Sequence, residues 1–312
     1  MNLFASMRYL VALHTHRHFG RAAQACHITQ PALSNAMRAL EGEFGVVIVK
    51  RGRTFVGLTP EGERVLASAQ RMLHEHMLLQ QELASEAGQP RGALRMGAVP
   101  TAMPILARFA AMLQTRYGGI VPAVLSMSSG ALETGLEDLS LDLALGYTDR
   151  AASTRLVCWP QYTERYFLLD RMDVPGEHGL QIGPHMRWDQ AARLPLCLLT
   201  PDMHNRSLVD GAFAQAGVQV QPVMQTNSVL TLALSVVAGT VCSVLPGALV
   251  DAVRGYGGLQ ARPLVGPDLC TPIGFMTHAT AQPSRVLEAA LALAQDAQWQ
   301  SHVAAHSGLL RG

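Results

Sequence analysis

A run of polar side chains that could bind nucleic acid lies between Thr29 and Phe44. A helix that turns 100° per residue would place four apolar residues of this segment on one stripe. They are Leu33, Ala36, Met37 and Leu40. The opposite face carries amide, hydroxyl and guanidinium groups, which hydrogen-bond to base edges and phosphates. The candidate DNA-contacting residues of this segment are Thr29, Gln30, Pro31, Ser34, Asn35 and Arg38.

The start of this helix is marked by its own residues. Thr29 is a good N-cap, and Pro31 lies in the first turn, where its missing N–H leaves no donor unpaired. Residues 19–28 before it indicate a shorter helix, in which Ala22 and Ala23 are small enough for close helix packing. Two helices joined by a tight turn form a helix-turn-helix, whose second helix enters the major groove.

A second group of cations follows this helix. The segment from Val46 to Thr59 is rich in β-branched residues and is broken by Gly52, so we expect a two-stranded wing. Lys50, Arg51 and Arg53 would lie near its bend, where they could contact the DNA backbone or the minor groove. The alternative is an ordinary solvated turn.

The N-terminal 60 residues resemble a known family. The run from Arg21 to Glu41, then Phe44-Gly-Val, then Leu58-Thr-Pro-Glu-Gly, resembles the N-terminal signature of LysR-type transcriptional regulators. The resemblance implies an α/β protein with an N-terminal winged helix-turn-helix, a long linker helix and a two-lobed periplasmic-binding-protein-like effector domain. It also implies a homotetramer. Asn35 departs from the pattern, because many relatives carry Arg there.

A long helix is expected after Thr59, a good N-cap that precedes Pro60 at the first helical position. Up to about Ala87, apolar residues and one histidine recur by four and three residues, the spacing of a coiled-coil seam. The seam residues are Val65, Ala69, Met72, His76, Leu79 and Leu83, widened by Leu66, Leu73 and Met77. We therefore expect residues 59–88 to be a dimerising linker that follows a DNA-binding domain at 1–58. A dimer would bind the two half-sites of an interrupted inverted repeat.

From Arg91 the sequence alternates between apolar strands and helices, which indicates an α/β fold with a mostly parallel sheet. Two such sets, joined by crossing strands near 160–165 and 265–271, resemble the effector domain of LysR-type regulators. The expected bounds are 89–312 for the effector domain, about 91–162 and 268–312 for lobe I, and about 163–267 for lobe II. Ligands of such folds bind beyond the carboxyl ends of the strands, here between the lobes.

Hydroxyl, amide and cationic side chains follow the ends of these strands and precede helices. Helix N-termini, hydroxyls and one arginine that converge would suit a small anion, most simply a carboxylate. The candidate effector-binding residues are Thr101, Ser128, Ser129, Thr200, His204, Asn205, Arg206, Asn227 and Ser228. Two alternatives remain open: several of these residues could merely cap helices, and Arg206 could pair with Asp202 or Asp210.

Two segments of the sequence narrow the range of molecules expected as the effector. Leu196 to Arg206 and Gly97 to Met103 look like the LysR-type regulators encoded beside soluble formate dehydrogenase operons. That resemblance implies formate or a comparably small oxoanion as the effector.

Charge and motifs limit the class of protein. The net charge of +1 hides an asymmetry, because residues 1–60 hold seven Lys and Arg against Glu41 and Glu43, a net +5, whereas residues 61–312 are net −4. A basic head suits a module that faces phosphates. The sequence contains no catalytic motif, cofactor fingerprint or metal-spaced cluster, so we expect no enzyme, no cofactor and no metal site.

The remaining composition indicates a cytoplasmic protein. The five cysteines are odd in number and scattered, which fits a reduced compartment. No signal peptide is apparent, and the uncharged run from Leu230 to Val250 contains Gly239 and Pro246, so we expect a buried helix, a turn and a strand there instead of a membrane span. The expected partners are double-stranded promoter DNA, a small anionic effector, further copies of the chain and RNA polymerase.

The sequence thus predicts a ligand-responsive regulator of transcription. Two other classes remain open. One is a two-lobed small-molecule binding protein, which would need an export signal if it were secreted. The other is an architectural DNA-binding protein that responds to no ligand.

Overall fold

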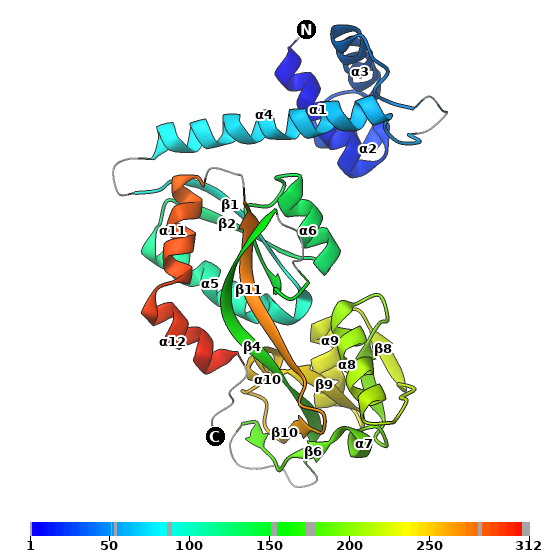
Figure 1. The fold of residues 1–312 in the computed structure, drawn as a ribbon, viewed down its shortest axis with the longest axis vertical. Helices are drawn as coiled ribbons and strands as arrows, with labels where there is room; N and C mark the ends of the chain where they lie inside the picture. The colour runs from blue at the N-terminus through cyan, green and yellow to red at the C-terminus, as the bar shows by residue number, and fades with distance from the viewer. Residues whose placement is uncertain are drawn as a thin grey trace. The chain divides into compact units, whose positions relative to one another are not determined.

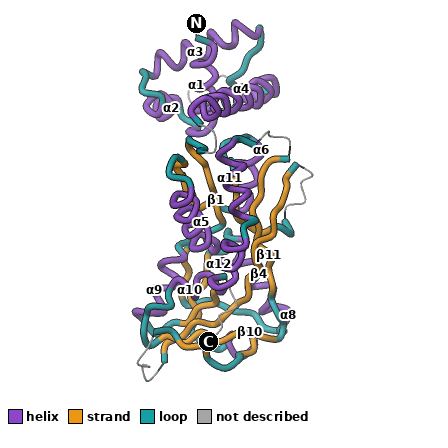
Figure 2. The backbone as a smooth tube through the Cα atoms, turned by 90° about the vertical axis from the view of Figure 1, so that its left-hand side faces the viewer, coloured by secondary structure: helices purple, strands orange, loops and turns teal. Residues whose placement is uncertain are grey.

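The computed structural model describes residues 2–50, 52, 55–85, 89–150, 155–172, 179–279 and 283–307. They form two compact units, one made mainly of residues up to Ala84 and one made mainly of residues from Ser85 onward (Figures 1 and 2). No helix in the described part of the chain is long and apolar enough to cross a membrane.

The first unit consists of four helices and a short wing. The helices are α1 (Leu3–His16), α2 (Phe19–Ala25), α3 (Gln30–Phe44) and α4 (Pro60–Ala84). Their apolar faces meet in one core in which Leu10, Leu13, Leu33 and Leu40 are fully buried. The stripe predicted from the sequence is therefore the buried face of α3.

Local capping fixes both ends of α3. The Thr29 hydroxyl accepts a hydrogen bond from the N–H of Ala32 at 3.3 Å, as expected of an N-cap. The helix ends at Gly45, whose φ of 65° is the left-handed conformation that glycine adopts without strain. A carboxylate then holds the following chain, because Glu41 Oε1 accepts the N–H groups of Ile48 at 2.8 Å and Val49 at 3.1 Å.

The wing is short and packs against the start of α4. Val49 and Leu58 form an isolated antiparallel bridge. Thr59 caps α4 by accepting the N–H of Gly62 at 2.9 Å. Gly62 approaches the wing so closely that an added Cβ would lie 2.2 Å from the carbonyl oxygen of Ile48.

Helix α4 leaves apolar side chains uncovered. It has 25 residues, roughly 37 Å at 1.5 Å per residue. Met72 is 47% exposed, Leu79 53% and Leu83 78%. These are three of the residues that the sequence assigns to a coiled-coil seam.

The second unit is built on one sheet with the strand order β2-β1-β3-β11-β4-β9-β7-β8. Two long strands, β4 (Leu156–Arg171) and β11 (Cys270–His278), pair antiparallel and run side by side from one lobe into the other (Figure 1). The sheet is therefore mixed, because the crossing strands run antiparallel to their neighbours while the outer strands of each lobe pair parallel.

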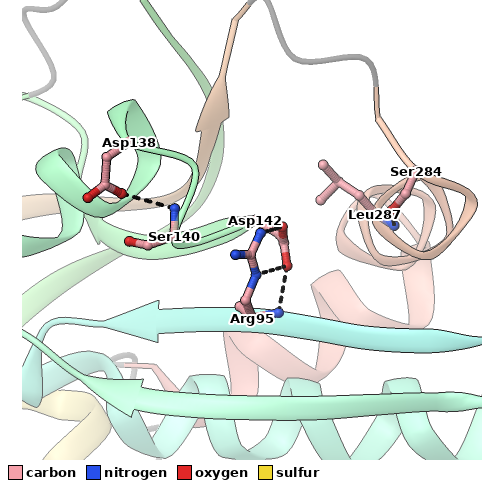
Figure 3. A network of polar contacts seen from close by, with 6 residues as sticks. All are labelled: Arg95, Asp138, Ser140, Asp142, Ser284 and Leu287. Atoms are coloured by element: carbon pink, nitrogen blue, oxygen red, sulfur yellow. Dashed lines mark hydrogen bonds and ion pairs between the residues drawn. The ribbon is translucent and has the colours of Figure 1, made fainter. Parts of the chain in front are cut away.

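Lobe I surrounds the first part of the sheet. Its other elements are β1 (Gly92–Ala98), η1 (Pro100–Ala102), α5 (Met103–Arg116), β2 (Ile120–Ser126), α6 (Ser129–Glu137), β3 (Leu143–Tyr147), α11 (Arg285–Ala294) and α12 (Ala297–His306). Its core contains Phe109, whose ring centroid lies 4.5 Å from the ring centroid of Phe275 and 4.9 Å from that of Trp299. The carboxylate of Asp142 accepts hydrogen bonds from the guanidinium of Arg95 and from the backbone N–H of Arg95 (Figure 3). These bonds fix β1 beside the start of β3.

Lobe II surrounds the second part. Its elements are β5 (Gln181–Ile182), β6 (Met186–Arg187), α7 (Trp188–Ala191), β7 (Leu196–Leu199), α8 (His204–Gln215), β8 (Met224–Thr226), α9 (Val229–Ala238), β9 (Cys242–Pro246), α10 (Gly247–Ala252) and β10 (Leu259–Val265). Two apolar clusters pack on its sheet. The uncharged run from Leu230 to Val250 forms the predicted helix and strand, and the short helix α10 begins within it.

Candidate functional site

The outward face of α3 carries the residues that the sequence selects for DNA contact. Thr29, Gln30, Pro31, Asn35 and Arg38 are exposed, and Ser34 is half-buried at the edge of this face. Arg38 Nη1 donates to Asn35 Oδ1 at 3.4 Å, so the bond uses the carbonyl oxygen of Asn35 and not its amide nitrogen. The face therefore presents hydrogen-bond donors of the kind that bind base edges.

The wing supplies one further described cation. Lys50 is exposed, and its backbone N–H donates to Gly57 O at 3.0 Å, which holds it where the wing turns. Arg51 and Arg53 lie outside the described residues.

The second unit contains a small cavity between its lobes. Its volume is about 20 Å³. The residues that line it from lobe I are Val99, Pro100, Thr101, Ser128, Ser129 and Tyr147. The residues that line it from lobe II are Leu199, Met203, His204 and Asn205. Five of the nine candidate effector residues, Thr101, Ser128, Ser129, His204 and Asn205, are thus brought together.

The other four candidates do not line the cavity. The Ser228 hydroxyl caps α9 by accepting the N–H of Thr231 at 3.2 Å, which is the alternative left open by the sequence. Asn227 is exposed. The hydroxyl of Thr200 is buried with no hydrogen-bond partner among the described residues.

Arg206 is held inside lobe II. It is only 8% exposed, and its Nη1 donates to Leu199 O at 2.7 Å while its Nε donates to Asp210 Oδ1 at 2.8 Å. Of the two roles considered for this arginine, its geometry favours the ion pair with Asp210 over ligand binding. No arginine or lysine is among the described residues that line the cavity.

One amide connects the walls of the cavity. Asn205 Nδ2 donates to Tyr147 Oη at 3.4 Å and to Tyr166 Oη at 3.0 Å. Tyr147 Oη in turn lies 3.1 Å from the hydroxyl of Thr101, which is 1% exposed. Burial raises the pKa of Tyr147 above its usual range, as does the nearby Glu164, so Tyr147 is a neutral hydroxyl.

His204, which lines the cavity, is a neutral imidazole. Burial lowers its pKa, and the neighbouring Arg150 lowers it further, so the ring is neutral near pH 7. Arg150 Nη1 lies 3.4 Å from His204 Nδ1, and because a guanidinium only donates, Nδ1 must be the acceptor. The ring proton is then on Nε2, which is buried without a hydrogen-bond partner among the described residues.

Tyr147, Tyr166 and Arg150 were not selected from the sequence. Tyr147 ends β3 in the run Gly-Tyr-Thr, and a polar residue at a strand end was the available signal. Tyr166 lies inside β4, and Arg150 follows β3 in a polar stretch, so neither position stands out without the fold.

None of the five cysteines lines the cavity. All five are described and free, and Cys197 is buried. Burial raises the pKa of the Cys26, Cys158, Cys197 and Cys242 thiols, which lowers their reactivity.

Comparison with known proteins assigns each of the two units to a known protein family. Residues 4–63 match the family described as "Bacterial regulatory helix-turn-helix protein, lysR family", and residues 87–299 match the LysR substrate binding domain. The DNA-binding transcriptional dual regulator OxyR of Escherichia coli (strain K12) is 28% identical over 306 residues, which cover 95% of each chain. The SDS degradation transcriptional activation protein of Pseudomonas sp. (strain ATCC 19151) is 37% identical over 70% of this chain and 66% of its own length.

A solved structure agrees with this placement. A full-length OxyR variant from Pseudomonas aeruginosa has a TM-score of 0.66 and 25% identity, and the similarity covers 92% of this chain and 95% of that one. The predicted architecture of a helix-turn-helix followed by a two-lobed effector domain is therefore confirmed. Because the substrate-binding-domain match alone spans more than half of the chain, the protein belongs to the LysR family of ligand-responsive, DNA-binding bacterial regulators, and it is not an enzyme.

Proposed function

We propose that this regulator senses formate, or a comparably small carboxylate, in the cavity between Thr101 and His204. The observation that carries the proposal is the gathering of five sequence-selected polar residues around this cavity. Two of their buried atoms, Ser129 Oγ and His204 Nε2, have no hydrogen-bond partner among the described residues. An unpaired buried polar atom costs about 1–3 kcal/mol, so a ligand that supplies the partner would bind in preference to an empty site.

Size and chemistry favour a small anion. The cavity volume of about 20 Å³ exceeds the roughly 10–15 Å³ that one water needs, so there is room for a small ligand. Hydroxyls and the Nε2–H of His204 can donate to a carboxylate from both lobes. Formate, with three heavy atoms, is the smallest carboxylate, and two segments of the sequence resemble regulators encoded beside formate dehydrogenase operons.

Hydrogen peroxide is the second candidate signal, because several relatives are named hydrogen peroxide-inducible genes activators. A thiol-based response would require a cysteine at the sensing site. None of the five cysteines lines this cavity, so a response that arises here would depend on a bound ligand and not on an oxidised thiol.

The DNA contacts that we propose follow from the exposed faces. Gln30, Ser34, Asn35 and Arg38 of α3 would enter the major groove, with Thr29 and Pro31 beside the backbone at the helix start. Lys50, together with Arg51 and Arg53, would contact phosphates or the minor groove.

We further propose that α4 joins two copies of the chain through the exposed side chains of Met72, Leu79 and Leu83. A dimer would present two copies of α3 to an interrupted inverted repeat, and dimers would pair into tetramers. Such a protein would act in the cytoplasm at a promoter, where RNA polymerase is the further partner.

The response would be a shift between two arrangements of the same oligomer. A ligand can shift such an equilibrium only through its different affinity for the two states. The cavity has walls from both lobes, so an anion that binds both walls favours the arrangement in which they are close.

Calorimetry on the full-length protein tests the effector. Formate and acetate would be titrated separately at pH 7, with sodium chloride at equal ionic strength as the control. We expect saturable one-site binding of formate, weaker binding of acetate because of its extra methyl group, and no binding heat with chloride. Absence of saturable binding by either carboxylate would contradict the proposed effector class.

A further inference from the structure

A fully buried carboxyl group lies behind the effector cavity. Glu164 is 0% exposed and lies on β4, where its backbone is in register with Thr271 of β11. Both residues therefore lie in the two strands that cross between the lobes. None of the proposed DNA or effector contacts uses this acid.

The groups that face Glu164 are hydroxyls and one amide. Tyr166 Oη donates to Glu164 Oε2 at 3.4 Å and lies 3.5 Å from Thr271 Oγ1. Tyr162 of β4, Tyr147 of β3 and Thr101 of η1 complete the cluster, and Asn205 of α8 reaches it through Tyr166. None of the described groups that affect Glu164 is a cation, and the acid Asp149 acts on Tyr147 of the cluster.

The amide of Asn205 sets the direction of the hydrogen bonds. Its Nδ2 donates to the hydroxyls of both Tyr147 and Tyr166, so each tyrosine must donate its own hydrogen elsewhere. Tyr166 donates to Glu164, and Tyr147 donates to Thr101. Thr101 then has one hydrogen to donate, either back toward Glu164 or into the cavity that it lines.

The charge of Glu164 decides between these two directions. Burial raises the pKa of Glu164 to about 8, against the smaller effects of the hydroxyls of Tyr166, Tyr162 and Thr101. An ionised carboxylate would attract the Thr101 hydrogen and would repel an anion in the cavity. A neutral carboxylic acid supplies its own hydrogen to the cluster and leaves the Thr101 hydroxyl free to donate to the ligand.

We propose that Glu164 is a specificity-determining residue that carries a proton whenever the anionic effector is bound, so that the occupied site holds one anion and one neutral carboxylic acid. The inference rests on the proposed effector site. It explains how a cavity whose described lining holds no lysine or arginine can bind a carboxylate. The anion remains a carboxylate, and the proton on Glu164 removes the negative charge that would repel it. Below the pKa of Glu164 this proton is already present, and above that pKa it is taken up from solvent on binding.

The expected pH dependence follows from this linkage. Below the pKa of about 8 Glu164 is already protonated in the free protein, so the Kd for formate should be constant. Above that pKa the free protein must take up a proton on binding, and the Kd should rise about tenfold per pH unit. His204, whose pKa is lowered, and the tyrosines, whose pKa values are raised, do not titrate in this window.

The test is calorimetry with formate on the full-length protein between pH 6.5 and 9.5. At pH 9, titrations in two buffers of different ionisation enthalpy should show uptake of close to one proton per formate in the wild type. Glu164→Gln, which is neutral at every pH, should bind formate with a constant Kd and no proton uptake. Glu137→Gln, at the exposed end of α6, should keep the wild-type profile.

The outcomes separate the two proposals. Formate that binds the wild type with a constant Kd and without proton uptake would overturn the role of Glu164 but leave the effector site intact. Formate that binds at no pH would overturn both. The wild-type proton count decides the question even if Glu164→Gln does not fold.

Discussion

Asn205 and Tyr147 join the two lobes of the second unit across the cavity that we propose for the effector. The Asn205 Nδ2 on α8 of lobe II donates to the Tyr147 hydroxyl on β3 of lobe I at 3.4 Å. Both residues line the cavity, and the same nitrogen donates to Tyr166 on the crossing strand β4 at 3.0 Å. A ligand that moves either wall of the cavity must therefore change this contact.

Replacing Asn205 should weaken effector binding. Asn205→Ala removes the donor shared by two buried hydroxyls, and a loss of about 1.4 kcal/mol corresponds to a Kd for formate about tenfold higher. Asn227→Ala, at an exposed position that does not line the cavity, should change that Kd by less than about twofold. Calorimetry measures both, and equal effects of the two variants would show that the cavity is not the effector site.

Two glycines of the first unit should respond to alanine in opposite directions. Gly62→Ala places a Cβ 2.2 Å from the carbonyl oxygen of Ile48, so α4 and the wing must separate and the free energy of unfolding should fall by about 1–3 kcal/mol. Gly42 lies within α3 with no atom within 4 Å of an added Cβ, so Gly42→Ala should stabilise the protein by about 0.5–1 kcal/mol. Chemical denaturation checks both signs, and a stable Gly62→Ala protein would argue against the close packing of α4 on the wing.

A charge on the exposed face of α4 should separate the dimer. Leu79 is 53% exposed in the single chain, and a glutamate there would prevent its burial against a second copy. Leu230→Glu is a matched control, because Leu230 is 65% exposed on α9 of the other unit. Analytical ultracentrifugation should show Leu79→Glu at a smaller assembly size than the wild type and Leu230→Glu unchanged. Retention of the wild-type size by Leu79→Glu would move the dimer interface away from this part of α4.

Variants of α3 and the wing should affect DNA binding differently. Gln30→Ala and Ser34→Ala should each cost about 1–3 kcal/mol at the specific site and much less on random duplex, because base contacts carry the specificity. Lys50→Ala should weaken binding to both the specific site and the random duplex. It should also reduce the slope of log K against log salt concentration by about one. Gel-shift titrations measure these values, and equal losses on both DNAs in the Gln30 or Ser34 variant would place the base-contacting face elsewhere.

Much of the fold follows from local patterns in the sequence. The start of α3 is encoded by Thr29 and Pro31, and its buried face by the spacing of Leu33, Met37 and Leu40. The two lobes follow from the alternation of apolar strands and helices. These signals are local, so they can be recognised without tertiary information.

The polar centre of the second unit depends on tertiary contacts instead. The stretch around Glu164 is polar in sequence, and only the packing of two lobes over β4 and β11 buries Glu164 completely. Arg206 shows the same effect, because its charge and position suit a ligand, whereas its i+4 partner Asp210 and the carbonyl of Leu199 hold it inside lobe II. Which polar side chains face the cavity is decided by the fold.

The central claim is that paired copies of α3 bind DNA under the control of a small anion. Its most direct test is the selection of binding sites from a random duplex pool by the full-length protein, followed by footprinting of the selected sites with and without formate. We expect an interrupted inverted repeat with two symmetric protected half-sites and a change in protection when formate is added. Selected DNA without a symmetric pair of protected sites, or a footprint that formate does not alter, would contradict the claim.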